Sequence, residues 1–232
     1  MTISVIMYKR LGISNAELAF YTGWLNLPWV IKPLWSPFID LIKTKRWWIT
    51  WMQLLIGAGL AGIAFTIPTD YFFQLTLAVC WLLAFSSATH DIAADGFYML
   101  GLSSHEQALF VGIRSTFYRI ATIAGQGLLI MLAGHLETTT GNIPFAWSIT
   151  FMVLAGLFLA LWGWHKFILP RPDTDKAARQ VSASTLMHEF WATFTSFFRK
   201  KQAGLAILFM LLYRLPEAQL AKMSIPFLVD PI

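Results

Sequence analysis

Residues 47–100 decide the fold, and they read WWITWMQLLIGAGLAGIAFTI (47–67), PTD (68–70) and YFFQLTLAVCWLLAFSSATHDIAADGFYML (71–100). A helix of roughly 20 apolar residues crosses the ~30 Å hydrocarbon layer of a membrane, and each of the two long runs reaches that length. The proline-containing turn between them is too short for a domain. The stretch therefore predicts two neighbouring membrane-spanning helices joined by a tight turn.

Similar apolar runs recur on both sides of this pair. The predicted spans are 16–37, 47–67, 71–100, 108–133, 144–168 and 203–228. The polar segments 101–107 and 134–142 separate the middle ones. The first ten residues, MTISVIMYKR, are too short to span and carry no signal-peptide cleavage site, so we expect them to be the outer end of a preceding helix. The chain is expected to be an incomplete portion of a larger bundle.

Composition supports a polytopic, all-α membrane helix bundle. The chain has 57% hydrophobic and 12% charged residues, whereas soluble domains carry about 25% charged residues. Its net charge of +5 is concentrated in short loops, so no nucleic-acid partner is expected. The single cysteine, Cys80, excludes an intramolecular disulfide and is expected to be a small packing residue.

Charge also predicts the domain organisation. We expect an N-terminal helical bundle over 1–168, a cytoplasmic linker over 169–202 and the first helix of a C-terminal bundle over 203–232. Within the linker, apolar residues from 186 to 198 recur at three- and four-residue steps, which predicts an amphipathic helix on the membrane surface. The basic triplet 199–201 after it would suit anionic lipid headgroups.

Basic residues set the predicted orientation. The loop after the first span holds Lys43, Lys45 and Arg46, and the linker holds six Lys or Arg residues, whereas the loops around Asp70 and Glu137 hold none. Basic loops stay on the cytoplasmic side of a membrane. Four spans lie between the two basic segments, so both fall on the same face, where tryptophans also cluster.

Seven of the ionisable residues inside the predicted spans are candidates for a functional role, since each would cost roughly 2.5 to 3.5 kcal/mol at the centre of a lone helix. They must pair or line a wet cavity. Together with two polar neighbours they give the candidate pathway for substrate and protons. The candidates are Lys32, Asp91, Asp95, Arg114, Tyr118, Arg119, Gln126, Arg214 and Glu217. The alternative is that these charges form structural pairs that fix the helix register.

The spacing of these residues predicts an acid and base cluster. Asp91 and Asp95 are four residues apart, so they occupy one helical face. Arg114 and Arg119 lie about 9 and 16 Å into the next span at 1.5 Å per residue, a depth that overlaps that of the aspartates. The ionisable set sums to +1, which favours an acidic solute.

Two further features concern helix packing. Pro216, between Arg214 and Glu217, predicts a break near the middle of the last span, and broken helices mark binding sites in transporters; a structural kink remains the alternative. Glycines on two spans are expected to allow close helix packing rather than to bind phosphate. They are Gly57, Gly59, Gly62, Gly125 and Gly127.

Three segments carry a family resemblance. LPWVIKPLWSPFID (27–40), followed by Lys45 and Arg46, resembles the loop between the second and third helices of major facilitator transporters. ATHDIAADGF (88–97) and GIRSTFYRIATIAGQG (112–127) resemble the fourth and fifth helices of the AmpG muropeptide permease family. The chain departs from the general facilitator motif at Ser36 and Lys43, where glycines are usual.

The resemblance implies a fold of twelve helices in two halves, of which this chain would supply about helices two to seven. It implies a cytoplasmic gate motif of Asp40, Lys45 and Arg46, and proton-coupled uptake of anhydromuropeptides or a similar bulky anionic solute. The expected partners are that solute, protons and membrane lipid. The protein would act as a monomer in a bacterial inner membrane, without cofactor or metal.

Two other function classes remain open at the level of sequence. A membrane-embedded enzyme, such as an acyltransferase or hydrolase, would need a nucleophile with a base or a metal cluster, and no such spacing occurs. A non-transporting scaffold or sensor could use the same helices, although intramembrane charges are costly to keep in a passive protein. A transporter is therefore the leading hypothesis.

Overall fold

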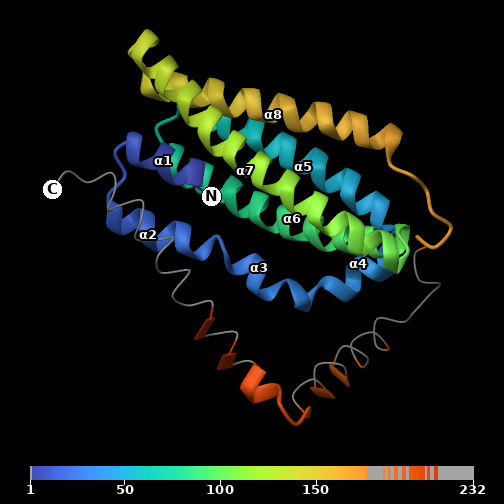
Figure 1. Cartoon of the computed structure of the whole chain (residues 1–232). Helices are drawn as coiled ribbons and strands as arrows, with labels where there is room; N and C mark the ends of the chain where they lie inside the picture. The colour runs from blue at the N-terminus through green and yellow to red at the C-terminus, as the bar shows by residue number, and fades with distance from the viewer. Residues whose placement is uncertain are drawn as a thin grey trace. The chain divides into compact units, whose positions relative to one another are not determined.

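The computed structural model describes residues 2–176 together with 185, 188, 191–192, 195–196, 199–206, 208–209 and 212–213. The chain divides into two compact units, Met1–Arg179 and Gln180–Ile232. The described residues contain helices and no strands, which confirms the all-α prediction (Figure 1). Arg214, Pro216 and Glu217, the break predicted around them and most of the predicted amphipathic helix lie outside the described residues.

The first unit contains eight α-helices and one 3-10 turn among its described residues. They are α1 (Thr2–Arg10), α2 (Asn15–Trp24), α3 (Leu27–Ile31), η1 (Lys32–Leu34), α4 (Ser36–Ile42), α5 (Lys45–Thr66), α6 (Phe72–Gly101), α7 (Ser104–Thr140) and α8 (Ile143–Ile168). Helices α5 to α8 are each long and apolar enough to cross a membrane. Four of the predicted spans are thus confirmed as helices, and α7 extends beyond the predicted 108–133 at both ends.

The predicted span over 16–37 is not one continuous helix. It is divided into α2, α3, η1 and the start of α4. Pro28, Pro33 and Pro37 each lie in the first turn of a new element. Proline lacks a backbone N–H and clashes with the preceding turn, so it starts helices but interrupts them from within. Hydrophobicity alone therefore predicted a longer helix than these prolines allow.

Short polar side chains begin the long helices. The Thr44 hydroxyl accepts from the backbone N–H of Trp47 at 3.1 Å at the start of α5, and the Asn142 side chain accepts from Phe145 N–H at 3.0 Å at the start of α8. Ser103 and Glu106 form a reciprocal capping box at the start of α7. These contacts satisfy N–H groups that the helix itself leaves unpaired, so they fix where each span begins.

Helix α5 is the centre of the bundle, because it packs along both α6 and α8 (Figure 1). Glycines make these approaches close. A Cβ added to Gly57 would lie 2.9 Å from Leu159 Cδ2 of α8, and one added to Gly59 would lie 2.6 Å from Leu83 Cδ2 of α6. The predicted packing role is confirmed for these two glycines. At Gly125 and Gly127 of α7 no described atom lies within 4 Å of an added Cβ.

An apolar core joins α1 to the long helices. Tyr8 and Trp147 are fully buried in it, and the Tyr8 hydroxyl lies 2.9 Å from Thr76 Oγ1 of α6. Cys80 is a free, buried thiol in the same core, as expected for a small packing residue. The segment before α2 is therefore part of the bundle rather than a separate tail.

The two basic segments of the first unit meet at one end of the bundle, here called the basic end. Asp175, after α8, accepts from the backbone N–H groups of Lys45 and Arg46 at 2.7 and 3.0 Å. The Arg46 guanidinium donates to the carbonyl oxygen of Leu169 at 3.1 Å. A carboxylate at a helix N-terminus also interacts favourably with the helix dipole. The start of the basic linker, up to Lys176, thus lies at the same end of the bundle as Lys45 and Arg46, and the placement of the whole linker stays a prediction.

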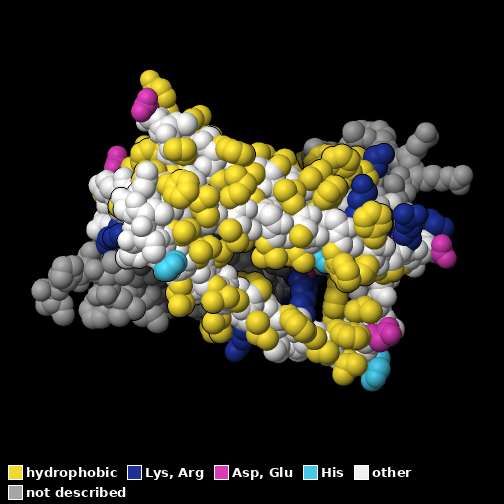
Figure 2. Space-filling model, turned by 90° about the horizontal axis from the view of Figure 1, so that it is seen from above, with side chains coloured by type: hydrophobic (Ala, Val, Ile, Leu, Met, Phe, Trp, Pro, Cys, Tyr) yellow, Lys and Arg dark blue, Asp and Glu magenta, His cyan; other side chains and the backbone are white. Residues whose placement is uncertain are grey.

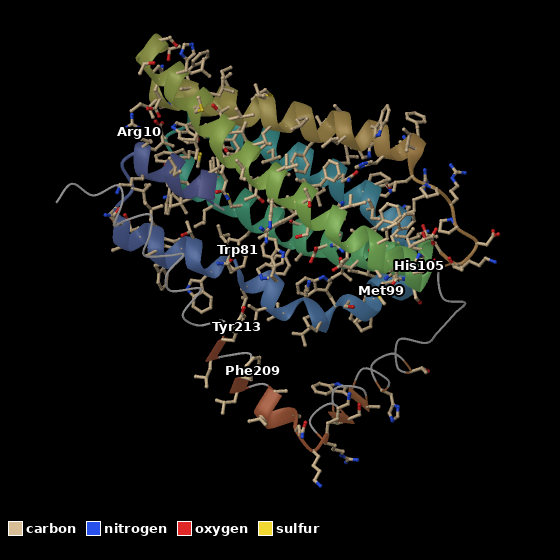
Figure 3. All side chains as sticks on the ribbon, in the orientation of Figure 1. Arg10, Trp81, Met99, His105, Phe209 and Tyr213 are labelled. Atoms are coloured by element: carbon tan, nitrogen blue, oxygen red, sulfur yellow. The ribbon has the colours of Figure 1, made fainter. Side chains whose placement is uncertain are left out.

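The opposite end has its own ion pair. Arg10 at the end of α1 pairs with Glu137 near the end of α7, and Glu137 also accepts from the Trp147 indole N–H at 2.7 Å. Figure 3 places Arg10 at one end of the bundle and Met99 and His105 at the other. In the second unit, the rings of Phe209 and Tyr213 stack at 6.0 Å.

We expect Gly57→Val to destabilise the bundle by about 1–3 kcal/mol, because its side chain would overpack the α5–α8 contact. The thermal unfolding midpoint in detergent measures the effect. Gly125→Val is the matched control, since no described atom lies near that position. Equal midpoints for the two variants would contradict the close α5–α8 packing.

Candidate functional site

Two ion pairs form on one face of α6. Asp91 Oδ2 lies 2.9 Å from Lys32 Nζ of η1, and Asp95 Oδ1 lies 2.5 Å from Arg114 of α7. Because the two aspartates are four residues apart, the pairs are stacked one helical turn apart. The four side chains are between 33% and 51% exposed, so they face an open space rather than the apolar core. Of the predicted acid and base cluster, Asp91, Asp95 and Arg114 are thus brought together with Lys32, whereas Arg119 is not.

A pocket of about 340 Å³ adjoins these pairs near the basic end. It is lined by Lys32, Pro33, Ser36, Lys45, Ile92, Asp95 and Gly96. Lys45 is only 8% exposed, and its methylene stem lies against Gly96, where an added Cβ would be 2.8 Å from Lys45 Cε. The absence of a side chain at Gly96 lets the lysine lie alongside α6 within this pocket.

The predicted gate residues therefore have different surroundings. Lys45 lines the pocket, whereas Arg46 points to the end of α8 and donates to backbone carbonyls there. Asp40 lies in α4, and its side chain is outside the description.

The remaining candidates on α7 are not brought to the aspartates. Tyr118 is 73% exposed, and Arg119 and Gln126 are also exposed. Arg119 makes no ion pair with any described residue. Arg114 instead lies over the Tyr98 ring of α6, 5.6 Å from its centroid, an attractive cation–π arrangement that the spacing of the charges did not predict. These three polar side chains are thus exposed on α7 among exposed apolar residues such as Phe117 and Ile123.

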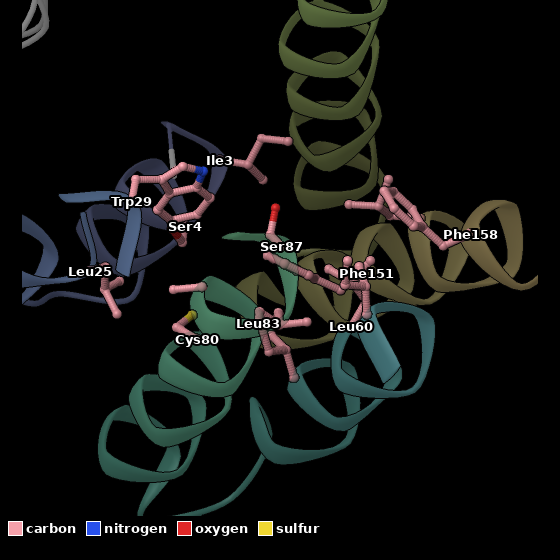
Figure 4. Close-up of a pocket in the computed structure, with 14 residues that line it drawn as sticks. Ile3, Ser4, Leu25, Trp29, Leu60, Cys80, Leu83, Ser87, Phe151 and Phe158 are labelled. Atoms are coloured by element: carbon pink, nitrogen blue, oxygen red, sulfur yellow. The ribbon is translucent and has the colours of Figure 1, made fainter. Parts of the chain in front are cut away.

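A second, largely apolar pocket of about 270 Å³ lies further along the same helix (Figure 4). Trp29, Leu60 and Phe151 are among its apolar lining residues, and Ser4 and Ser87 supply hydroxyls. Ser87 is four residues before Asp91. The three residues Ser87, Asp91 and Asp95 therefore share one face of α6 over about 12 Å. This face leads from an apolar pocket to a charged one.

The molecular surface also separates apolar from charged side chains. Figure 2 shows a face covered mainly by hydrophobic side chains, and within it a hollow in which Lys and Arg side chains lie. An apolar exterior with cationic groups in a recess is the arrangement expected when intramembrane charges avoid lipid and line an aqueous space.

Comparison with known proteins places the chain in a family. The family model described as BT1 family matches residues 1–214. The chain belongs to the BT1 family. No solved structure matches this BT1-family chain significantly.

Relatives of the BT1-family chain include a Haemophilus influenzae protein described as uncharacterized, which is 31% identical over 96% of this chain and 50% of its own length. The Escherichia coli K12 protein named anhydromuropeptide permease is 26% identical over 99% of this chain and 43% of its own length. The Rickettsia felis protein named AmpG 4 is 26% identical over 97% of this chain and 56% of its own length. The chain spans about half the length of the curated relatives it matches.

These relatives confirm the predicted resemblance to AmpG-like permeases. With four helices long enough to span a bilayer, the BT1-family chain is a multi-pass membrane protein. The Escherichia coli relative is named as a permease and not as an enzyme, so its name does not favour the enzyme alternative.

Exchanging the two charges tests the Lys32–Asp91 pair, which connects η1 to α6. We expect Asp91→Lys to lower the thermal midpoint, because two cations would then face each other, and Lys32→Asp combined with Asp91→Lys to restore most of the loss. The coupling should be no more than about 1 kcal/mol, since the pair is partly exposed. Asp70→Lys in the exposed turn is the control. A double variant as unstable as the sum of the single ones would show that the pair does not form.

Proposed function

We propose that the BT1-family chain forms part of a secondary active transporter of the major facilitator type. Its cargo would be anhydromuropeptides or similarly bulky anionic solutes, taken up together with protons. The chain would supply about helices two to seven, with an N-terminal bundle over 1–168, a linker over 169–202 and the first helix of a second bundle from 203.

The observation that carries the proposal is the composite face of α6. Its apolar pocket suits the nonpolar part of an amphiphilic solute, and its charged pocket suits an acidic group. Lys32, Lys45 and Arg114 bring three cations to the two aspartates, so the described part of the path keeps a positive balance. A cationic recess raises the local concentration of anions. The name of the Escherichia coli relative supports the choice of cargo.

The same proposal covers location and gating. The basic end would face the cytoplasm of a bacterial inner membrane, because basic loops are retained there. Asp40, Lys45 and Arg46 would form the inner gate, and Tyr118, Arg119 and Gln126 of α7 would line the aqueous route. Arg214 and Glu217 would continue the path on the first helix of the second bundle. Lipid would surround a monomer.

Uptake into vesicles tests the function directly. The complete transporter that contains this chain is reconstituted in proteoliposomes, and entry of labelled anhydromuropeptide is measured with and without an inward proton gradient. Accumulation that depends on the gradient supports proton-coupled transport. Uptake that does not depend on the gradient would contradict proton coupling. No uptake at all would favour the scaffold or sensor alternative.

Arg114 is the sharpest single test of the anionic cargo. We expect Arg114→Gln to reduce uptake by roughly tenfold, which corresponds to about 1.4 kcal/mol, while the amount of protein inserted in the membrane stays the same. Arg171→Gln, in the exposed segment after α8, is the matched loss of charge elsewhere. Unchanged uptake in Arg114→Gln would remove this residue from the path.

A further inference from the structure

Proton coupling requires a group that binds and releases a proton, and the sequence suggests Asp91, Asp95 and Glu217 for that role. Both described aspartates are held by cations, Lys32 and Arg114. Protonation of either would leave a cation without its partner. A group that takes up a proton without breaking such a pair would serve better, and Glu217 lies outside the described residues.

A polar cluster between three spans offers such a group. Gln53 of α5 is 8% exposed, and its side-chain amide contacts His165 Nδ1 of α8 at 2.8 and 3.1 Å through its nitrogen and oxygen. His90 of α6 interacts electrostatically with His165, and its Nε2 atom is buried with no hydrogen-bond partner among the described residues. Two imidazoles and an amide thus lie among apolar helices that otherwise pack through glycine and aliphatic side chains.

We propose that His90 and His165 form the proton-binding site of the transporter, an inference that rests on the proposed function. Histidine is the side chain whose charge ordinarily changes between pH 5 and 8. The buried Nε2 of His90 has no acceptor for an added proton, and a buried donor without a partner is unfavourable. The conformation described therefore holds His90 neutral, and proton uptake at Nε2 requires an opening that admits water.

Asp91 links this site to the solute path. It follows His90 in the sequence, interacts with it electrostatically and pairs with Lys32 in the charged pocket. A proton on His90 adds positive charge beside the path while Asp91 stays paired with Lys32, and this added charge favours binding of an anionic solute. Release of the proton to water on the far side removes that charge and favours release of the solute. His165 limits the site to one proton, because a second imidazolium would repel the first.

Two transport measurements on the complete transporter that contains this chain test the site. Gradient-driven accumulation of labelled anhydromuropeptide is compared with gradient-free exchange in proteoliposomes. His90→Gln and His165→Gln should lose accumulation by roughly tenfold, a coupling within the usual range, while exchange persists. His105→Gln and His135→Gln remove exposed histidines and should leave both rates unchanged. Accumulation retained in both core variants, with loss in Asp91→Asn or Asp95→Asn, would overturn the proposal in favour of the carboxylates.

A second measurement is independent of the solute. Ring signals of the histidines in the purified full chain are followed by NMR across pH 5–8. Replacing His165 should move the titration midpoint of His90, and the reverse, because each imidazolium acts on the other. Midpoints that do not respond would overturn the site even if transport is confirmed. If the wild-type chain transports nothing, the proposed function fails, and coupled midpoints would still support a shared proton site.

Discussion

A charged side chain inside a hydrocarbon layer must find an opposite charge or water, and this constraint organises one side of the bundle. Asp91 and Asp95 of α6 are too deep in a spanning helix to be left to lipid. Asp91 pairs with Lys32 of the broken segment before α5, and Asp95 pairs with Arg114 of α7. These two ion pairs connect η1 and α7 to α6, whereas the packing contacts of α7 are mainly with α8.

Apolar packing organises the other side. Gly57 and Gly59 let α5 approach its two neighbours closely, and this face leaves little space for water. The contrast between a tightly packed side and a charged, half-exposed side is typical of helices that surround an aqueous path on one face only. The histidine cluster is exceptional because it puts titratable groups on the packed side, where the Nε2 atom of His90 is buried in the conformation described.

Much of this arrangement could be predicted from the sequence, for identifiable reasons. Long apolar runs predicted four of the helices, over 47–67, 71–100, 108–133 and 144–168, because length and hydrophobicity alone define a span. The polar ends of α7, which the structure extends over Ser104–Thr140, were not predicted as helix. Arg114 and Asp95 could be matched by depth, since they flank a single short loop. The contact of Lys32 with Asp91, 59 residues away, depends on how prolines redirect the chain before α5, and no local pattern specifies that path. The Gln53–His165 contact likewise joins helices whose rotation about their axes is set only by packing.

The Asp175 cap on α5 has a consequence for the order in which the protein is made. The central helix of the bundle has its first-turn amides closed by a carboxylate 130 residues later in the chain. During synthesis, the Lys45 and Arg46 N–H groups of α5 therefore lack this acceptor until α8 and the segment after it have been made. The contact that completes the N-terminus of α5, the first long helix of the bundle, can therefore form only after α8 has been made.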